Sequence, residues 1–361
     1  AVALSQEILD LALRTRIDEG LHPDVTGRIV EVREALRHLL KEEGLDDLVA
    51  SFEPGEYNPQ ATVGENLLFG AATGPAMSGQ ELARDPYFLS VLRADGLGEA
   101  LYRMGLEIAS NAIELFADLP PDHPFFQQLA FMTAEDIVPY QQLLQRLRGK
   151  PFESVSSEDP ASIVKLSFAY IEPRHRFALL TPYENLPERL QGAIERYDPQ
   201  KYTAAATLMD NVLFGRISHS QPDGPERIRA IVRDLLDTLG LHDEVLDIGL
   251  DFNVGVGGRR LTGGQRQKLE VARALLKRAD YIIFNRPLAA LDQRTQDAIS
   301  RNVLEEIRRE DRKPAVIWVL PNPHLAKLFD RVVVFHSGEM AEDGTHETLT
   351  SKNGIFTRLL Q

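Results

Sequence analysis

Two adjacent glycines, Gly263 and Gly264, stand directly before a helical pattern in this chain of 361 residues. After Gln265, apolar residues recur with the spacing of an amphipathic helix as far as Leu276. The first turn of a helix leaves several backbone N–H groups without partners, and the helix dipole favours a negative charge there. The turn that begins at Thr262 therefore has the physical properties of a phosphate contact.

A short apolar run follows this helix and leads into a second turn. Residues 281–284 have the pattern of a buried strand, Asn285 and Arg286 come directly after it, and residues 288–292 form the turn. A glycine pair before a helix is by itself most often an ordinary turn. The complete order of glycine turn, helix, strand and turn is more specific, and it resembles the segment from the signature motif to the Walker B strand of ABC-type ATPases, closest to exporters.

This resemblance assigns expected roles to individual positions. In ABC dimers the signature contacts the γ-phosphate of an ATP held by the opposite subunit, and the D-loop carboxylate faces the dimer partner. The resemblance places the signature on Leu261, Thr262, Gly263, Gly264 and Gln265, the Walker B positions on Asn285 and Arg286, the D-loop on Leu291 and Asp292, the switch position on Pro321 or the later His324, and a Q-loop candidate on Gln200. We favour a loop role for His324 and a plain core or surface role for Gln200 over these family roles.

The elements that hydrolyse ATP in this family are missing or replaced. The only Gly-Lys pair, Gly149-Lys150, precedes Pro151 and does not form the P-loop that cradles phosphates. Asn285 cannot supply the carboxylate that a hard cation prefers, and the guanidinium of Arg286 cannot accept a proton. We therefore expect ATP and Mg²⁺ in trans only, no metal site in the chain, and no hydrolysis of ATP in cis.

Composition narrows the remaining possibilities. The chain has no cysteine, which excludes disulfides and thiolate metal sites and fits a reducing compartment. The net charge of −14 argues against a broad nucleic-acid surface. No stretch approaches the roughly 20 apolar residues of a membrane span, and no signal peptide is recognisable. We expect a cytoplasmic protein, or one at the cytoplasmic face of the membrane. Because the chain begins with Ala1 rather than Met, we also expect it to be a piece of a longer protein.

An internal repeat links the two halves of the chain. Residues 57–70 and 197–215 share a Tyr-x-Pro-Gln start, at Tyr57 and Tyr197, and an acidic-Asn-apolar-Leu-Phe-Gly end. The period of about 140 to 145 residues is too long for a solenoid, so we interpret it as a duplicated stretch of one subdomain; chance similarity is the alternative. Only the second copy continues into the signature. Further matches join residues 91–97 with 235–241, and 104–108 with 248–252.

We expect an α/β fold with an excess of helix. Residues 156–361 are expected to form an ABC-ATPase-like (RecA-like) domain with a signature helical subdomain, which the resemblance covers specifically from about residue 197. Residues 1–155 are expected to be mostly helical, with a partial repeat of the ABC helical segment. The predicted parallel core sheet consists of residues 281–284, 315–320 and 331–335.

Three hypotheses follow from these patterns. The chain is a degenerate ABC nucleotide-binding domain that pairs with a second, competent one, with a transmembrane permease domain as a further partner, and serves transport. Alternatively, it is a regulatory or interaction protein that uses the same fold without nucleotide. The third hypothesis is an active ATPase with a P-loop before Ala1, against which Asn285 and Arg286 argue.

Overall fold

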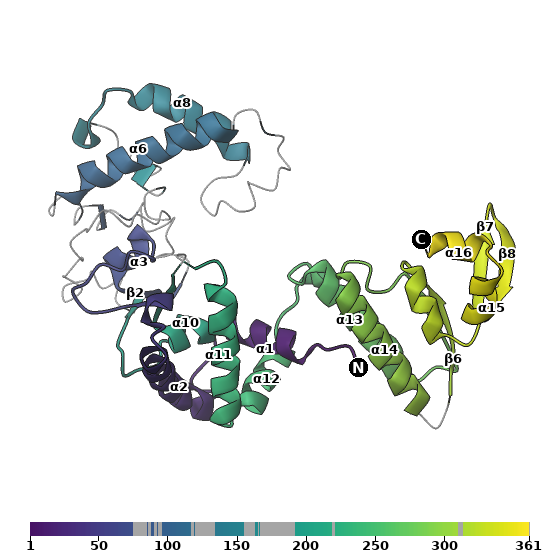
Figure 1. Cartoon of the computed structure of the whole chain (residues 1–361). Coiled ribbons are helices and arrows are strands. Elements are labelled where there is room, and N and C mark those ends of the chain that lie inside the picture. The colour runs from purple at the N-terminus through teal and green to yellow at the C-terminus, as the bar shows by residue number, and fades with distance from the viewer. Residues whose placement is uncertain are drawn as a thin grey trace. The chain divides into compact units, whose positions relative to one another are not determined.

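The computed structural model divides the chain into two compact units (Figure 1). One, here called the signature unit, consists of Ala1–Ala12 and Leu246–Gln361. The other, here called the repeat unit, is Leu13–Val245. The structure describes residues 1–74, 85, 88–89, 92, 96–116, 119, 134–154, 163–164, 166, 192–218, 221–309 and 313–360.

The described part of the repeat unit is mostly helical, with four short strands. Its described elements are α2 (Pro23–Glu42), β1 (Val49–Ser51), α3 (Val63–Leu68), β2 (Gly70–Ala72), α6 (Leu97–Phe116), α8 (Ile137–Leu147), β3 (Ile194–Arg196), α10 (Leu208–Leu213), β4 (Gly215–Ile217) and α11 (Gly224–Thr238), with short 3₁₀ turns at Asp46–Leu48, Ala134–Asp136 and Phe152–Ser154.

Both copies of the internal repeat begin their helix in the same way. Thr62 caps α3 through a capping box with Glu65, and Thr207 caps α10 through the same box with Asp210. Each helix ends at a phenylalanine in the left-handed conformation, with φ 43° in the first copy and 42° in the second. Thr207 follows Thr62 by 145 positions, within the predicted period. The duplication seen in the sequence is therefore also a duplication of backbone structure.

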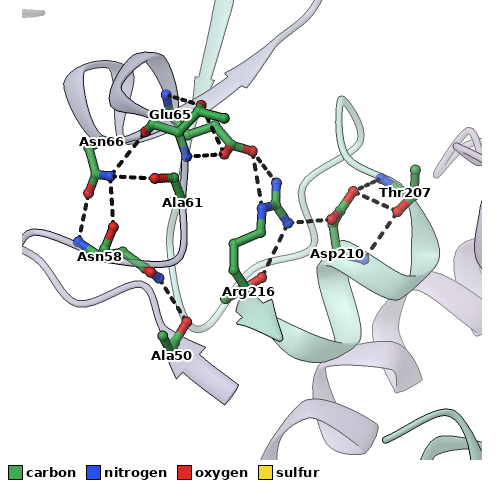
Figure 2. Close-up of polar contacts among 10 residues, drawn as sticks. Ala50, Asn58, Ala61, Glu65, Asn66, Thr207, Asp210 and Arg216 are labelled. Atoms are coloured by element: carbon green, nitrogen blue, oxygen red, sulfur yellow. Dashed lines mark hydrogen bonds and ion pairs between the residues drawn. The ribbon is translucent and has the colours of Figure 1, made fainter. Parts of the chain in front are cut away.

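A buried asparagine closes the loop before each helix. In the first copy, Oδ1 of Asn66 accepts the Asn58 N–H at 2.7 Å, and its amide nitrogen donates to the Asn58 carbonyl at 2.9 Å (Figure 2). In the second copy, Asn211 exchanges the equivalent bonds with Thr203, at 2.7 and 2.8 Å. Because buried backbone groups need partners, these side chains fix the conformation of both loops.

The two copies are interlocked by their strands. The strand before the first copy, β1, pairs antiparallel with β4 after the second copy, and β3 before the second copy pairs with β2 after the first. A Cβ atom at Gly215 would lie far inside van der Waals contact of the Ala50 carbonyl, and one at Gly70 would lie 2.5 Å from that of Glu195. Both positions therefore require glycine because the paired backbones approach too closely for a side chain.

Four aromatic side chains gather where the copies meet. Phe52 stacks on Tyr197 with ring centroids 4.7 Å apart, and Phe69 and Phe214 each pack edge-on against this pair. Tyr197 follows Phe52 by 145 positions, so these two are structural counterparts. The sequence alignment that matched Tyr197 with Tyr57 is therefore wrong at its first residues, because the loops that precede Asn66 and Asn211 differ in sequence.

One buried arginine joins α2 to the second copy. Arg33 is fully buried, and its guanidinium donates to the Asn211 carbonyl at 2.7 Å and to the Pro199 carbonyl at 2.6 Å. The same group lies 4.5 Å over the ring of Phe214. Burial lowers the pKa of Arg33 to about 10, which keeps the side chain charged at neutral pH. The charge is therefore stabilised by carbonyl oxygens and an aromatic face.

The signature unit contains a parallel strand pair. α13 and α14 lie side by side (Figure 1), and residues of both helices pack in one apolar cluster with the strands β5 and β6. The described elements are α1 (Ser5–Leu13) and α12 (His242–Leu250), which reach into the repeat unit, then α13 (Gly263–Leu276), β5 (Tyr281–Asn285), α14 (Gln293–Arg309), β6 (Ala315–Val319), η8 (Pro323–Leu328), β7 (Val332–His336), β8 (Glu339–Gly344), α15 (His346–Ser351) and α16 (Ile355–Leu359), with a 3₁₀ turn at Val256–Gly258.

The third predicted strand of the core sheet pairs differently. β5 and β6 pair in parallel as predicted, whereas β7 pairs antiparallel with β8. The connection between β7 and β8 is the tight turn Ser337-Gly338, in which both residues have positive φ values of 50° and 83°, as hairpin turns require. Among the described residues, the predicted three-stranded sheet is therefore a parallel pair, β5–β6, and a separate antiparallel hairpin, β7–β8.

Among the described residues, an apolar cluster covers one face of the β5–β6 pair and leaves the other exposed. Ile282 and Phe284 point into the cluster with α13 and α14, while Tyr281 and Ile283 on the opposite face are 75% and 69% exposed. No helix among the described residues has the length and apolar character needed to cross a membrane.

The compact units do not coincide with the predicted division into residues 1–155 and 156–361. β1 and β2 lie before residue 155, and each pairs with a strand that lies after it. In the signature unit, the buried ammonium of Lys268 on α13 forms an ion pair with Glu7 on α1. Both units therefore combine segments that lie on either side of residue 155.

Candidate functional site

The predicted phosphate-contact turn is a capped helix start. Thr262 is the N-cap of α13: its hydroxyl accepts the N–H of Gln265 at 3.2 Å, and the Gln265 side chain accepts the Thr262 N–H at 2.9 Å. Gly263 and Gly264 are the first two helical residues, whose N–H groups have no acceptor within the helix. The turn thus retains two backbone donors at the positive end of a 14-residue helix.

The structure brings the turn together with the predicted D-loop. Gly264 is buried, and a Cβ atom there would overlap the side chain of Leu291. The backbone N–H of Ala290 donates to the side chain of Gln267 on α13 at 2.8 Å. Sequence reasoning missed Gln267, since it lies inside the helix and carries no motif signal. This contact holds residues 290–291 against the first turn of α13.

The carboxylate of Asp292 is engaged locally. It accepts the backbone N–H of Thr295 at 3.1 Å and the Thr295 hydroxyl at 2.6 Å, and so caps the first turn of α14. The hydrogen bond from the Thr295 hydroxyl, followed by that from its N–H, lowers the pKa of Asp292 below its ordinary value of 3.8. The side chain is exposed, so a partner could still approach it.

The end of β5 carries an amide and a guanidinium where the resemblance would place two carboxylates. Asn285 and Arg286 are both exposed, and Arg286 adopts the left-handed conformation with φ 47° while its N–H donates to the Val319 carbonyl at 3.3 Å. Within the part of the chain that the structure describes, no group of three or more His, Asp or Glu residues could hold a metal ion. The two positions that the resemblance assigns to Walker B therefore carry no carboxylate of the kind that Mg²⁺ prefers.

The remaining predicted positions lie in surface turns. Pro321 is exposed, and His324 is exposed in the first turn of η8, where its backbone N–H donates to the Asn322 side chain at 3.1 Å. Gln200 is exposed in the repeat unit, and its N–H donates to the carboxylate of Asp198 at 3.0 Å. The described contacts of His324 and Gln200 are those of turn residues, and their predicted switch and Q-loop roles stay predictions.

Sequence reasoning also missed the buried ion pair behind the turn. Lys268 is only 6% exposed, and its ammonium contacts the carboxylate of Glu7 and the carbonyl of Ala3. The two charged residues lie 261 positions apart, which no local pattern could reveal. The pair holds α1 against α13. Because a buried charge requires a partner, α1 helps to keep α13 and its first turn in place.

Known proteins similar to this chain are ABC transporter proteins. It is 31% identical over 208 residues to an ATP-dependent lipid A-core flippase of Chromobacterium violaceum, covering 56% of this chain and 34% of that protein. It is 32% identical over 178 residues to YheI of Bacillus subtilis, a probable multidrug resistance ABC transporter ATP-binding/permease protein, covering 48% of this chain and 28% of the relative.

A third relative is the lactococcin-G-processing and transport ATP-binding protein LagD of Lactococcus lactis, 32% identical over 210 residues, or 57% of this chain and 28% of that protein. The chain thus spans about a third or less of the length of these relatives. No protein-family model matches it.

Proposed function

We propose that this chain, whose relatives are ABC transporter proteins, contributes its signature turn to ATP held by a partner nucleotide-binding domain. In this proposal the chain serves export-type transport at the cytoplasmic face of a membrane, beside a permease domain, without hydrolysing ATP itself. The names of its relatives include ATP binding, transport and a permease, which supports this assignment by similarity.

One observation carries the proposal. The turn at Thr262, Gly263 and Gly264 is formed and capped, and residues 290–291 pack against it. At the end of β5, by contrast, Asn285 and Arg286 stand in place of the two carboxylates that hydrolysis requires. An arrangement that keeps the anion-contacting turn while lacking the means of hydrolysis favours a contact in trans. Asp292, exposed beside that turn, would face the partner.

The experiment measures association between the full chain and an ABC nucleotide-binding domain that contains a P-loop. We expect ATP to promote the complex, as seen by analytical ultracentrifugation. Gly263→Asp places a carboxylate in the turn, and we expect it to weaken the complex by about tenfold or more because like charges oppose each other. Gly263→Ala is the matched control, since its Cβ atom would lie 3.4 Å from that of Ala290, an ordinary contact.

Gly264 is less suitable for this test because any side chain there would overlap Leu291. ATP-independent association, or equal behaviour of the Gly263→Asp and Gly263→Ala variants, would contradict the proposed contact.

A second candidate is a regulatory or interaction protein that uses the fold without nucleotide. The side chains of Gln265 and Asp292, which would face nucleotide or partner, are hydrogen-bonded within the chain, and this favours a purely structural role for both. ATP would then leave the melting temperature of the chain and of its mixture with the partner unchanged, whereas a ligand that binds the native state must raise it.

A further inference from the structure

The contacts that hold the repeat unit together run between the two copies. The N–H of Phe52 donates to the Phe214 carbonyl at 2.9 Å, and the N–H of Tyr197 donates to the Phe69 carbonyl at 3.1 Å. These two bonds are counterparts, because each joins the strand before one copy to the helix end of the other. Each copy therefore has one strand before its helix and one strand after it, and both of these strands pair with strands of the other copy.

Arg216 is a residue in which the two copies differ. It lies on β4 between the acidic residues of the two capping boxes, where its guanidinium donates to Asp210 at 2.5 Å and to Glu65 at 3.1 Å (Figure 2). Glu65 and Asp210 are counterparts, but the counterpart of Arg216 is Ala71. One cation of the second copy therefore neutralises an acid of each copy.

This asymmetry has a consequence for how copies recognise each other. Two first copies would bring two Glu65 carboxylates together with only alanines at position 71, so the charges would repel. A first copy paired with a second copy gains Arg216 between Glu65 and Asp210. The side chains of all three are about a quarter to a third exposed, so their charges are only partly screened by water.

We propose that two copies of this chain associate by exchanging these strands, the first copy of one chain pairing with the second copy of the other, and that Arg216 selects this pairing over that of two first copies. The exchanged dimer makes the same strand, aromatic and ionic contacts as the closed chain, which is why exchange of identical elements is an accessible route to dimers. The association involves no nucleotide and is independent of the proposed function.

The natural absence of cysteine allows a direct test. Val49 faces Ile217 in the β1–β4 ladder, and Ala72 faces Ile194 in the β2–β3 ladder. The bonds at Phe52 and Ser218 place Val49 and Ile217 at a non-hydrogen-bonded pair, where Cα atoms lie about 4.5 Å apart and a disulfide can form.

Differently tagged full-length chains that carry Val49→Cys and Ile217→Cys are unfolded together, refolded and oxidised. We expect a covalent heterodimer, because neither chain contains a complete cysteine pair. A mixture of Val49→Cys and Ala72→Cys chains reports pairing of two first copies, and we expect about tenfold less product because like charges oppose it. Adding Arg216→Ala to both chains of each mixture should bring the two amounts of covalent heterodimer closer together.

A doubly substituted chain, Val49→Cys with Ile217→Cys, serves as the control for register. If it closes its disulfide within one chain while the mixed single variants give no heterodimer, the pairing is correct and the exchange is overturned. If the Val49→Cys and Ala72→Cys mixture cross-links as strongly as the other mixture, selection by Arg216 is overturned.

Discussion

The two copies of the internal repeat share their backbone conformation but differ in charge and surroundings. Asn66 and Asn211 make the same pair of loop bonds, yet only Asn211 also contacts a buried arginine, Arg33. Arg216 stands where the first copy has Ala71. A few residues thus preserve a shape through duplication, while the side chains around them are free to specialise. Three measurements can break or sharpen this comparison, and a fourth tests a helix cap in the signature unit.

The largest loss of stability is expected at the glycines where the paired strands of the two copies bring their backbones into close contact. Gly215→Val places a side chain against the Ala50 carbonyl, and Gly70→Val does so against that of Glu195. We expect each to lower the free energy of unfolding by about 3 kcal/mol or more, since overpacking forces the backbone apart. Urea denaturation measures this, with Gly27→Ala as control because a Cβ atom there meets nothing within 4 Å. Unequal losses at Gly70 and Gly215 would show that the two strand pairs are not equivalent.

The next effect separates the two asparagines. Asn66→Ala should lower the free energy of unfolding by about 2 kcal/mol, because it leaves buried backbone groups without partners. Asn211→Ala should lower it by about 1 kcal/mol more, since hydrogen bonds to charged groups are stronger and Arg33 also loses a contact. Equal losses of unfolding free energy for the two variants in urea denaturation would mean that the contact with Arg33 adds no stability to the second copy.

A smaller loss is expected from the charge that only the second copy has. Arg216→Ala should lower the free energy of unfolding by about 1 kcal/mol, because the pair with Glu65 and Asp210 is partly exposed. Glu65→Gln in the same chain should recover part of this loss by removing the unpaired charge. If the two substitutions are simply additive in a double-mutant cycle, Glu65 and Arg216 are not coupled.

The smallest effect lies in the signature unit, where a carboxylate caps a helix through a threonine. Thr295→Val removes the hydroxyl bond to Asp292, so the pKa of Asp292 should rise toward 3.8. Because this pKa is lower in the folded chain, the cap stabilises the fold above the ordinary pKa and is lost as pH falls through the folded value. NMR titration measures the shift, and an unchanged pKa would exclude the Thr295 hydroxyl as its cause.

Sequence patterns were most reliable where the signal is local. The turn at Thr262, the helix after it and the strand before Asn285 follow from glycine, capping and apolar spacing within about 25 residues. The repeat was also visible, because Asn66 and Asn211 lie in matching sequence. The turn, the helix and the strand need no knowledge of distant parts of the chain, and the repeat needs only a comparison of the sequence with itself.

Long-range pairing was beyond the same reasoning. β1 and β4 have three residues each, too few for an alternating pattern, and their partners lie in another copy of the repeat. The ion pair of Lys268 with Glu7 and the burial of Arg33 likewise depend on residues far along the chain. Gln200 illustrates a different case, since its described contact is that of a local turn and its predicted Q-loop role stays a prediction.

The uncovered face of the β5–β6 pair affects how this protein must be handled. Tyr281 and Ile283 present their rings and methyl groups to solvent, and contiguous apolar surface of this kind promotes self-association in dilute buffer. The full chain should therefore precipitate sooner on concentration than its Ile283→Lys variant. Ile283→Lys is thus a practical aid to keeping the chain in solution at high concentration.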